Sequence, residues 1–142
     1  MSAVRKVAPG VAPDVAADAE ADIRALLQDY FDGLHFSDVA RLGRVFHPSA
    51  MYACATSGTL QLLDMAAYLP VVAQRPAPAS CGQPRADEVV SIEMAGPVTA
   101  LARVHCTIAP KRFTDLLTLV RLDGRWQILA KVFHFELEAP AR

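Results

Sequence analysis

The chain has 142 residues, of which 53% are hydrophobic and 20% are charged, and its formal net charge is −1. This length suits one domain with a buried core, and the hydrophobic content excludes a globally disordered chain. The balanced charge offers no basic surface for a phosphate backbone, so nucleic acid is not an expected partner.

The N-terminal residues 1–17 are rich in alanine, valine and proline and follow no helical or strand period. They predict a flexible arm, followed by one domain over residues 18–139. Prolines and acidic residues interrupt any signal peptide, and no apolar run is long enough to span a membrane. We therefore expect a cytoplasmic protein without a membrane partner. Its three cysteines have neither disulfide nor metal-site spacing, which predicts free thiols.

Two helices are predicted next. Apolar residues that recur every three or four positions indicate the first helix: Ile23, Leu26, Leu27, Tyr30, Phe31 and Leu34. Ser37 or Asp38 can cap a second short helix, and the dipeptide His47-Pro48 ends it, because the residue before proline avoids the helical region.

The middle of the chain predicts two short strands and a third helix. Residues 50–56 and 60–63 suit strands, and Asp64 can cap a helix over residues 65–74. The proline-rich residues 75–86 indicate a surface loop.

The C-terminal part changes to a period of two, which is typical of strands. Strands are predicted over residues 89–94, 100–108, 113–122 and 125–137, and Asp123-Gly124 is a hairpin turn. Helices followed by antiparallel strands indicate the α+β class.

Alternation away from the Asp123-Gly124 turn divides the last two strands into two faces. One face would carry Leu116, Thr118, Val120, Gln127, Leu129, Lys131 and Phe133. The other would carry Asp115, Leu117, Leu119, Trp126, Ile128, Ala130, Val132 and His134. A one-residue bulge would exchange the two lists.

Both faces are largely apolar, so each is expected to be buried against another part of the chain or another subunit. The face with Thr118 and Lys131 mixes polar groups with leucines, which is typical of a small-molecule site under the helices. The opposite face suits a homodimer interface, formed by Leu117, Leu119, Trp126, Ile128, Val132 and His134. A different protein could also cover it, which would make the chain an interaction domain.

The segments F-H-P-S-A at residues 46–50 and D-G-R-W-Q-I-L-A-K-V-F at residues 123–133 resemble the nuclear-transport-factor-2-like superfamily. The resemblance covers about residues 20 to 137 and is greatest to the putative lumazine-binding family. It implies a cone-shaped α+β barrel, with three N-terminal helices on a curved, mainly antiparallel mixed sheet around a pocket. It also implies dimers. Members include isomerases, dehydratases, cyclases and binding modules, so the fold alone settles no function.

The ketosteroid isomerases of this superfamily use an aspartate base and an oxyanion hole of a tyrosine and a protonated aspartic acid. The resemblance places their tyrosine on Tyr30, their base on Cys54 and their protonated acid on Thr118. Only the tyrosine matches in type, so steroid isomerisation by that mechanism is not expected.

We therefore expect a domain that binds a small, partly apolar ligand, with no cofactor. The expected pocket consists of Tyr30, Tyr52, Cys54, Leu116, Thr118, Leu129, Lys131 and Phe133. The alternative is an enzyme of the isomerase, dehydratase or cyclase type, in which Tyr30 acts with Lys131 or Cys54. No pair of histidines has metal-site spacing, so no metal is expected.

Overall fold

The fold is described from a computed structural model, which covers residues 4–6 and 13–138. Its elements are β1 (Val4–Lys6), α1 (Pro13–His35), α2 (Val39–Val45), β2 (Phe46–Cys54), β3 (Gln61–Asp64), α3 (Met65–Gln74), the 3-10 helix η1 (Pro78–Cys81), β4 (Glu88–Met94), β5 (Thr99–Ile108), β6 (Lys111–Leu122) and β7 (Arg125–Leu137). The three α-helices and the sheet confirm the predicted α+β class.

Helix α1 buries the face that its apolar period predicts. Ile23, Leu27 and Tyr30 are fully buried in the core. The helix begins earlier than expected, at Pro13, a residue that favours the first helical turn. Val4–Lys6 pair in parallel with β4, so part of the expected arm belongs to regular elements. The rest of that arm, residues 1–3 and 7–12, lies outside the described residues.

Two aspartates cap the next helices as the sequence predicts. The Asp38 side chain accepts a hydrogen bond from the Arg41 backbone nitrogen at 3.1 Å, at the start of α2. Asp64 accepts one from the Ala67 backbone nitrogen at 2.9 Å, at the start of α3. Each cap satisfies a backbone donor that the first helical turn leaves unpaired. None of the helices in the described ranges has the length and apolar character needed to cross a membrane.

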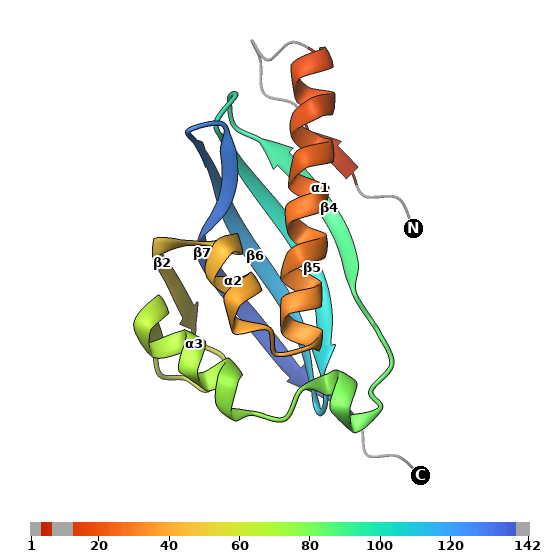
Figure 1. Ribbon diagram of the computed structural model, residues 1–142, viewed down its shortest axis with the longest axis vertical. Coiled ribbons are helices and arrows are strands. Elements are labelled where there is room, and N and C mark those ends of the chain that lie inside the picture. The colour runs from red at the N-terminus through yellow and green to blue at the C-terminus, as the bar shows by residue number, and fades with distance from the viewer. Residues whose placement is uncertain (1–3, 7–12, 139–142) are drawn as a thin grey trace.

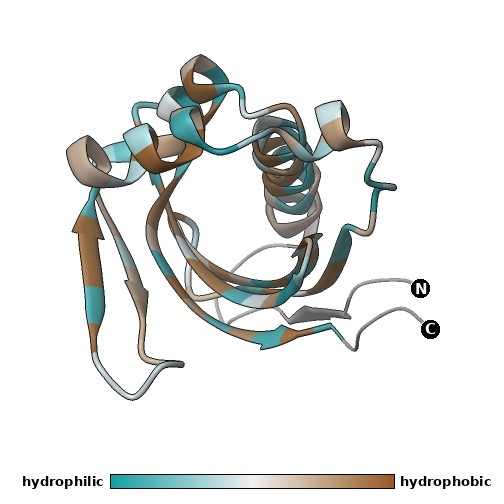
Figure 2. Cartoon of the chain, turned by 90° about the horizontal axis from the view of Figure 1, so that it is seen from below, coloured by the Kyte–Doolittle hydropathy of each residue, from teal (hydrophilic) through white to brown (hydrophobic). Residues whose placement is uncertain are grey.

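The seven strands form one sheet in the order β1-β4-β5-β6-β7-β2-β3. Strands β4 to β7 are antiparallel neighbours, whereas β2 runs parallel to β7. Figure 1 shows α1 lying over the sheet in front of β5, with α2 beside α1 and α3 beyond α2, near β2. Viewed along its length, the sheet is strongly curved and α1 lies on its concave side (Figure 2). The core therefore lies inside the curve.

A bulge in β7 decides which side chains face that core. Leu119 pairs with Ile128, but the adjacent Thr118 pairs with Ala130, so Leu129 is an extra residue without a partner on β6. The alternation of β7 therefore shifts by one residue in the middle of the strand. Trp126 and Ile128 point inward before the bulge, and Lys131 and Phe133 point inward after it.

Because of the bulge, the predicted division of β6 and β7 into two faces is partly wrong. The predicted interface residues Leu117, Leu119, Trp126 and Ile128 belong to the buried core under the helices and cannot form an outer surface. The predicted pocket residues Leu116, Thr118 and Leu129 are only half-buried and do not belong to that core. Strict alternation fails here because the bulge lies within β7, so only half of each list is exchanged. Val132 and His134 remain on the outer face, and Val132 is 50% exposed.

Candidate functional site

A lysine and an aspartate form an ion pair inside the curved sheet. Lys131 is 4% exposed and Asp115 is fully buried. The Lys131 Nζ atom lies 3.9 Å from Asp115 Oδ2. Lys131 pairs across the sheet with Leu117 of β6, which places Asp115 two residues further along the same inward face. Both charges are removed from water, which is costly unless each charge is compensated.

Aromatic rings surround the ammonium group of Lys131. Its Nζ atom lies 5.2 to 5.7 Å from the centres of five rings, which belong to Tyr30, Tyr52, Tyr68, Phe113 and Phe133. Distances within about 6 Å allow favourable cation–π interactions. We call these five rings with Lys131 and Asp115 the aromatic cage. A cage of this kind suits a cation, and the protein's own lysine supplies that cation.

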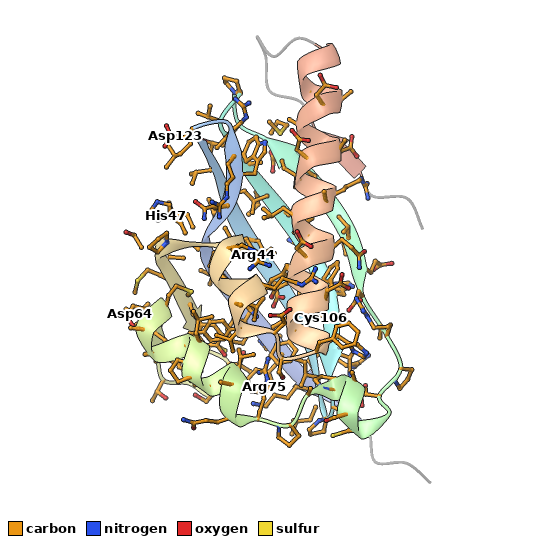
Figure 3. All side chains as sticks on the ribbon, in the orientation of Figure 1. Arg44, His47, Asp64, Arg75, Cys106 and Asp123 are labelled. Carbon is orange, nitrogen blue, oxygen red and sulfur yellow. The ribbon has the colours of Figure 1, made fainter. Side chains whose placement is uncertain are left out.

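Two further groups of the core contact the carboxylate. The Tyr30 hydroxyl donates a hydrogen bond to Asp115 Oδ2 at 2.7 Å, and the Cys106 thiol donates to the same oxygen at 3.7 Å. Cys106 lies on β5 near the C-terminal end of α1 (Figure 3). Burial, followed by the charge of Asp115, raises the pKa of Tyr30 well above its usual value and also raises the pKa of the Cys106 thiol. Both groups therefore remain protonated donors at neutral pH.

The charge state of Lys131 follows from two opposing effects. Burial by itself would lower the pKa of the ammonium, but the neighbouring carboxylate of Asp115 contributes in the other direction, and the pKa is raised above its usual value. Lys131 is therefore protonated at neutral pH. An ammonium in this state can donate hydrogen bonds and stabilise a negative charge, but it cannot act as a base or a nucleophile.

Four buried polar atoms around the cage have no hydrogen-bond partner. They are the Tyr68 hydroxyl, Asp115 Oδ1, and Nε and Nη2 of Arg75. Arg75 directly follows α3. Burial raises the pKa of Tyr52, and the positive charges of Lys131 and Arg75 offset only part of this increase. Each unpaired buried donor or acceptor costs about 1–3 kcal/mol. The cage is thus rich in unpaired donors, with one unpaired acceptor.

The structure brings together some of the expected pocket residues. Tyr30, Tyr52, Lys131 and Phe133 all belong to the cage, and Tyr52 stacks on the Tyr68 ring at a centroid distance of 4.5 Å. Tyr30 directs its hydroxyl hydrogen to Asp115, so that hydrogen is already engaged.

Cys54 is buried at the end of β2 and has its own hydrogen-bond partner. Its thiol donates to Thr56 Oγ1 at 3.3 Å, and Thr56 Oγ1 lies 3.0 Å from Nδ1 of the exposed His134. Leu116 and Thr118 are not part of this cluster, because they alternate along β6 with the inward Asp115, Leu117 and Leu119. Leu129 is the bulged residue of β7 and is also outside the cluster.

Sequence reasoning missed five members of the site: Tyr68, Arg75, Cys106, Phe113 and Asp115. The sequence alternation placed Asp115 on the face opposite the expected pocket. The one available signal was its position in an apolar strand, two residues before the inward Leu117. Among the described residues, no group of three or more His, Cys, Asp or Glu side chains could hold a metal ion.

Comparisons with known proteins agree on the family and the fold. The family model described as "Putative lumazine-binding" matches residues 18–134. A nuclear-transport-factor-2-like protein of unknown function from Shewanella baltica is similar in structure, with a TM-score of 0.76, 20% identity, and coverage of 88% of this chain and 97% of that one. A "putative scytalone dehydratase" from Novosphingobium aromaticivorans gives a TM-score of 0.63 at 12% identity and covers 92% of this chain and 94% of that one. These two likenesses show the shared fold.

A shorter match concerns an enzyme. Over 40 residues the chain is 40% identical to Aldolase FrzH from Cladobotryum sp. The match covers 27% of this chain and 32% of the aldolase, so the chain spans about a third of that relative.

Proposed function

Because this chain belongs to the putative lumazine-binding family, we propose that its aromatic cage binds a compact, planar small molecule that carries carbonyl or carboxylate oxygens. The observation that carries this proposal is a set of unpaired donors: the hydroxyl of Tyr68, whose ring lies beside Lys131, and two nitrogens of Arg75, whose charge acts on Tyr52. Oxygen acceptors on a ligand would satisfy these donors, and stacking on Tyr52 would favour a flat ring.

The ammonium of Lys131 already lies among the cage rings, and this restricts the charge of the ligand. A planar cation would compete with the ammonium of Lys131 for the same rings, whereas a neutral or anionic acceptor would add to its interactions. One donor on the ligand would suit the unpaired Asp115 Oδ1. Tyr52 and Phe113 are the half-buried rings of the cage, so we propose that the ligand approaches from their side.

Calorimetric titration tests this proposal with three probes: lumazine, 2-naphthoate and the cation N-methylquinolinium. We expect saturable binding of lumazine or 2-naphthoate and none of the cation. Arg75→Gln and Tyr68→Phe each remove a donor and should weaken binding about tenfold, which corresponds to roughly 1.4 kcal/mol. Arg103→Gln changes an exposed arginine of β5 and serves as the control. Failure of both oxygen-bearing probes, or equal binding to all variants, would contradict the proposal.

A second candidate function is catalysis at a carbonyl group, favoured by the buried ammonium beside an unpaired carboxylate oxygen and by the short match to an aldolase. In this reaction Asp115 Oδ1 takes a proton from the carbon next to the carbonyl, and the C–H electron pair moves to form an enolate. Lys131 then stabilises the enolate oxygen.

Proton–deuterium exchange in 2-tetralone, followed by NMR, tests this step. The wild type should accelerate exchange at the carbon beside the carbonyl, and Asp115→Asn should abolish the acceleration. Equal rates with and without protein would exclude the catalytic candidate and leave the binding function unaffected.

The outer face of the sheet supports a homodimer as a further part of this proposal. Leu101 and Val132 are 36% and 50% exposed, and Leu116 and Thr118 between them are half-buried. Adjacent apolar side chains on one sheet face would be covered by a second copy. Sedimentation should give a dimer for the wild type and a monomer for Val132→Glu. A monomeric wild type would instead favour a different protein as the partner of this face.

A further inference from the structure

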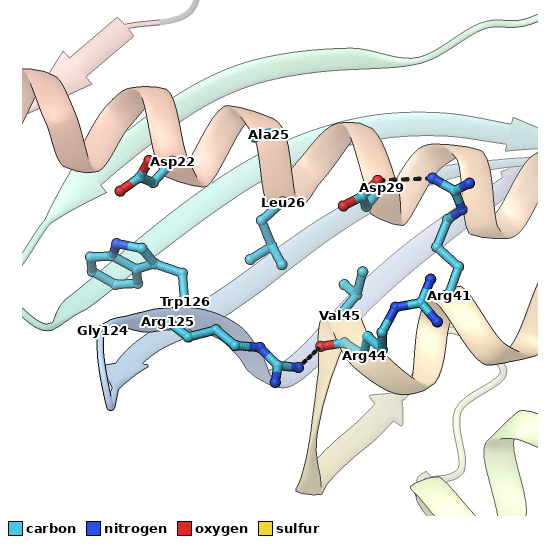
Figure 4. A pocket seen from close by; sticks show the side chains of 10 residues that line it. All are labelled: Asp22, Ala25, Leu26, Asp29, Arg41, Arg44, Val45, Gly124, Arg125 and Trp126. Atoms are coloured by element: carbon cyan, nitrogen blue, oxygen red, sulfur yellow. Dashed lines mark hydrogen bonds and ion pairs between the residues drawn. The ribbon is translucent and has the colours of Figure 1, made fainter.

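A second hollow lies away from the aromatic cage, between α1, α2 and the β6–β7 turn. Its volume is about 430 Å³. Figure 4 shows side chains of all three elements converging on it. Its lining includes Asp22, Leu26, Arg44, Val45, Arg125 and Trp126. We call it the arginine groove.

Two arginines of the groove form no ion pair with any residue that the structure describes. The side chain of Arg44 makes no hydrogen bond or ion pair with any described residue, although the pKa of Asp38 is lowered by hydrogen bonds from Arg41 and, in part, by the charge of Arg44. Arg125 donates from Nη2 to the backbone oxygen of Arg44 at 2.6 Å, which fixes its guanidinium at the C-terminal end of α2. Arg41 also lines the groove but is paired with Asp29 at 2.9 Å. Within the part of the chain that the structure describes, the groove therefore offers two guanidinium groups that form no ion pair.

The remaining wall is apolar and ends at a tryptophan. Leu26 and Val45 line the side between the helices, and Trp126 lines the end near Asp22. Trp126 is 5% exposed, and its indole nitrogen is buried without a hydrogen-bond partner. Asp22 and Trp126 also line a second hollow of about 210 Å³, so they lie together at this end.

We propose that the arginine groove binds a small carboxylate with an apolar ring. A carboxylate presents two oxygens in a plane, which matches the fork of a guanidinium, so Arg44 and Arg125 recognise it better than they recognise a neutral amide. The ring packs on Leu26, Val45 and the Trp126 indole. A volume of about 430 Å³ suits a ligand of this size. The site shares no residue with the aromatic cage and is independent of the function proposed for it.

Tryptophan fluorescence provides a specific test, because Trp126 is the only tryptophan of the chain. We expect phenylacetate to change this fluorescence in a saturable manner. Phenylacetamide has the same shape without the charge, and its dissociation constant should be at least about tenfold higher, since it lacks the charge-assisted hydrogen bonds. No saturable change with phenylacetate, or equal affinity for both compounds, would overturn the proposal.

Two variants locate the binding. Arg44→Gln removes a side chain that forms no hydrogen bond or ion pair with the described residues, so the protein should fold normally while its phenylacetate affinity falls about tenfold. Arg103→Gln on β5 removes an equal charge outside the groove and should leave the affinity unchanged. An equal loss in both variants would show a nonspecific charge effect and refute the site.

Discussion

The replacement of Lys131 by methionine tests the energetic basis of the aromatic cage. Methionine is apolar, flexible and similar in length, so it can fill the space among the five rings. It leaves the carboxylate of Asp115 fully buried without its positive partner. The hydrogen bonds from Tyr30 and Cys106 remain, but they do not neutralise the charge. We therefore expect a large loss of stability from a substitution that keeps the packing.

The expected loss follows from the geometry. At the observed separation of 3.9 Å, an effective dielectric constant of about 20 gives an attraction of roughly 4 kcal/mol. Removal of one partner of a buried ion pair typically costs about 3–5 kcal/mol. We expect Lys131→Met to lower the free energy of unfolding by this amount.

The double variant Lys131→Met/Asp115→Asn separates the charge effect from packing. Asparagine can still accept the hydrogen bond of Tyr30 but carries no charge. The double variant should therefore regain at least about 2 kcal/mol relative to the single variant, because replacing both ions of a buried pair is often neutral.

Urea unfolding, followed by circular dichroism, measures these differences. Lys111→Met is the matched control: Lys111 also lies over a ring, Phe135, at 4.5 Å, but it is exposed to solvent. The control should cost less than about 1 kcal/mol, as expected for exposed cation–π contacts. A single variant as stable as this control, or a double variant less stable than the single one, would refute the proposed ion pair.

Two further predictions concern pH and helix packing. Three buried groups have raised pKa values. The usual values are 9.0 for Cys106, 10.0 for Tyr30 and 10.5 for Lys131. Since the folded chain holds these protons more tightly, the stability they provide is complete below the unfolded pKa values and is lost as pH rises through the alkaline range. The free energy of unfolding should fall by up to about 1.4 kcal/mol per pH unit for each group, and a flat alkaline profile in urea titrations would contradict this. Gly33→Ala would place a Cβ atom 2.5 Å from the buried Leu42 Cδ2, and we expect a net loss of about 1–2 kcal/mol from overpacking. Gly43→Ala, which meets no atom within 4 Å, should instead stabilise the chain by about 0.5–1 kcal/mol in the same assay.

Most elements of the fold could be predicted because their signals are local. The apolar period of α1, the caps Asp38 and Asp64 and the Asp123-Gly124 turn each depend on residues within a few positions. Asp123 and Gly124 both adopt positive φ angles, as the two-residue hairpin requires.

The composition of the site was less predictable because it depends on contacts distant in sequence. The docking of α3 brings Tyr68 into the cage and Arg75 close enough to act on Tyr52, and nothing in their local sequence indicates it. Asp115 and Lys131 were assigned to opposite faces for a related reason: strict alternation does not include the bulge of β7, which brings the two charges to the same face.

The bulge at Leu129 links these points to function. A regular β7 would present either Trp126 and Ile128, or Lys131 and Phe133, to the inner face, but not both pairs. The extra residue lets the strand direct both halves inward, so its first half completes the core beneath α1 and its second half supplies the cation of the cage. One unpaired residue thus positions both the arginine groove, through Trp126, and the aromatic cage, through Lys131. This explains why the two candidate sites lie on the same strand and yet share no side chain.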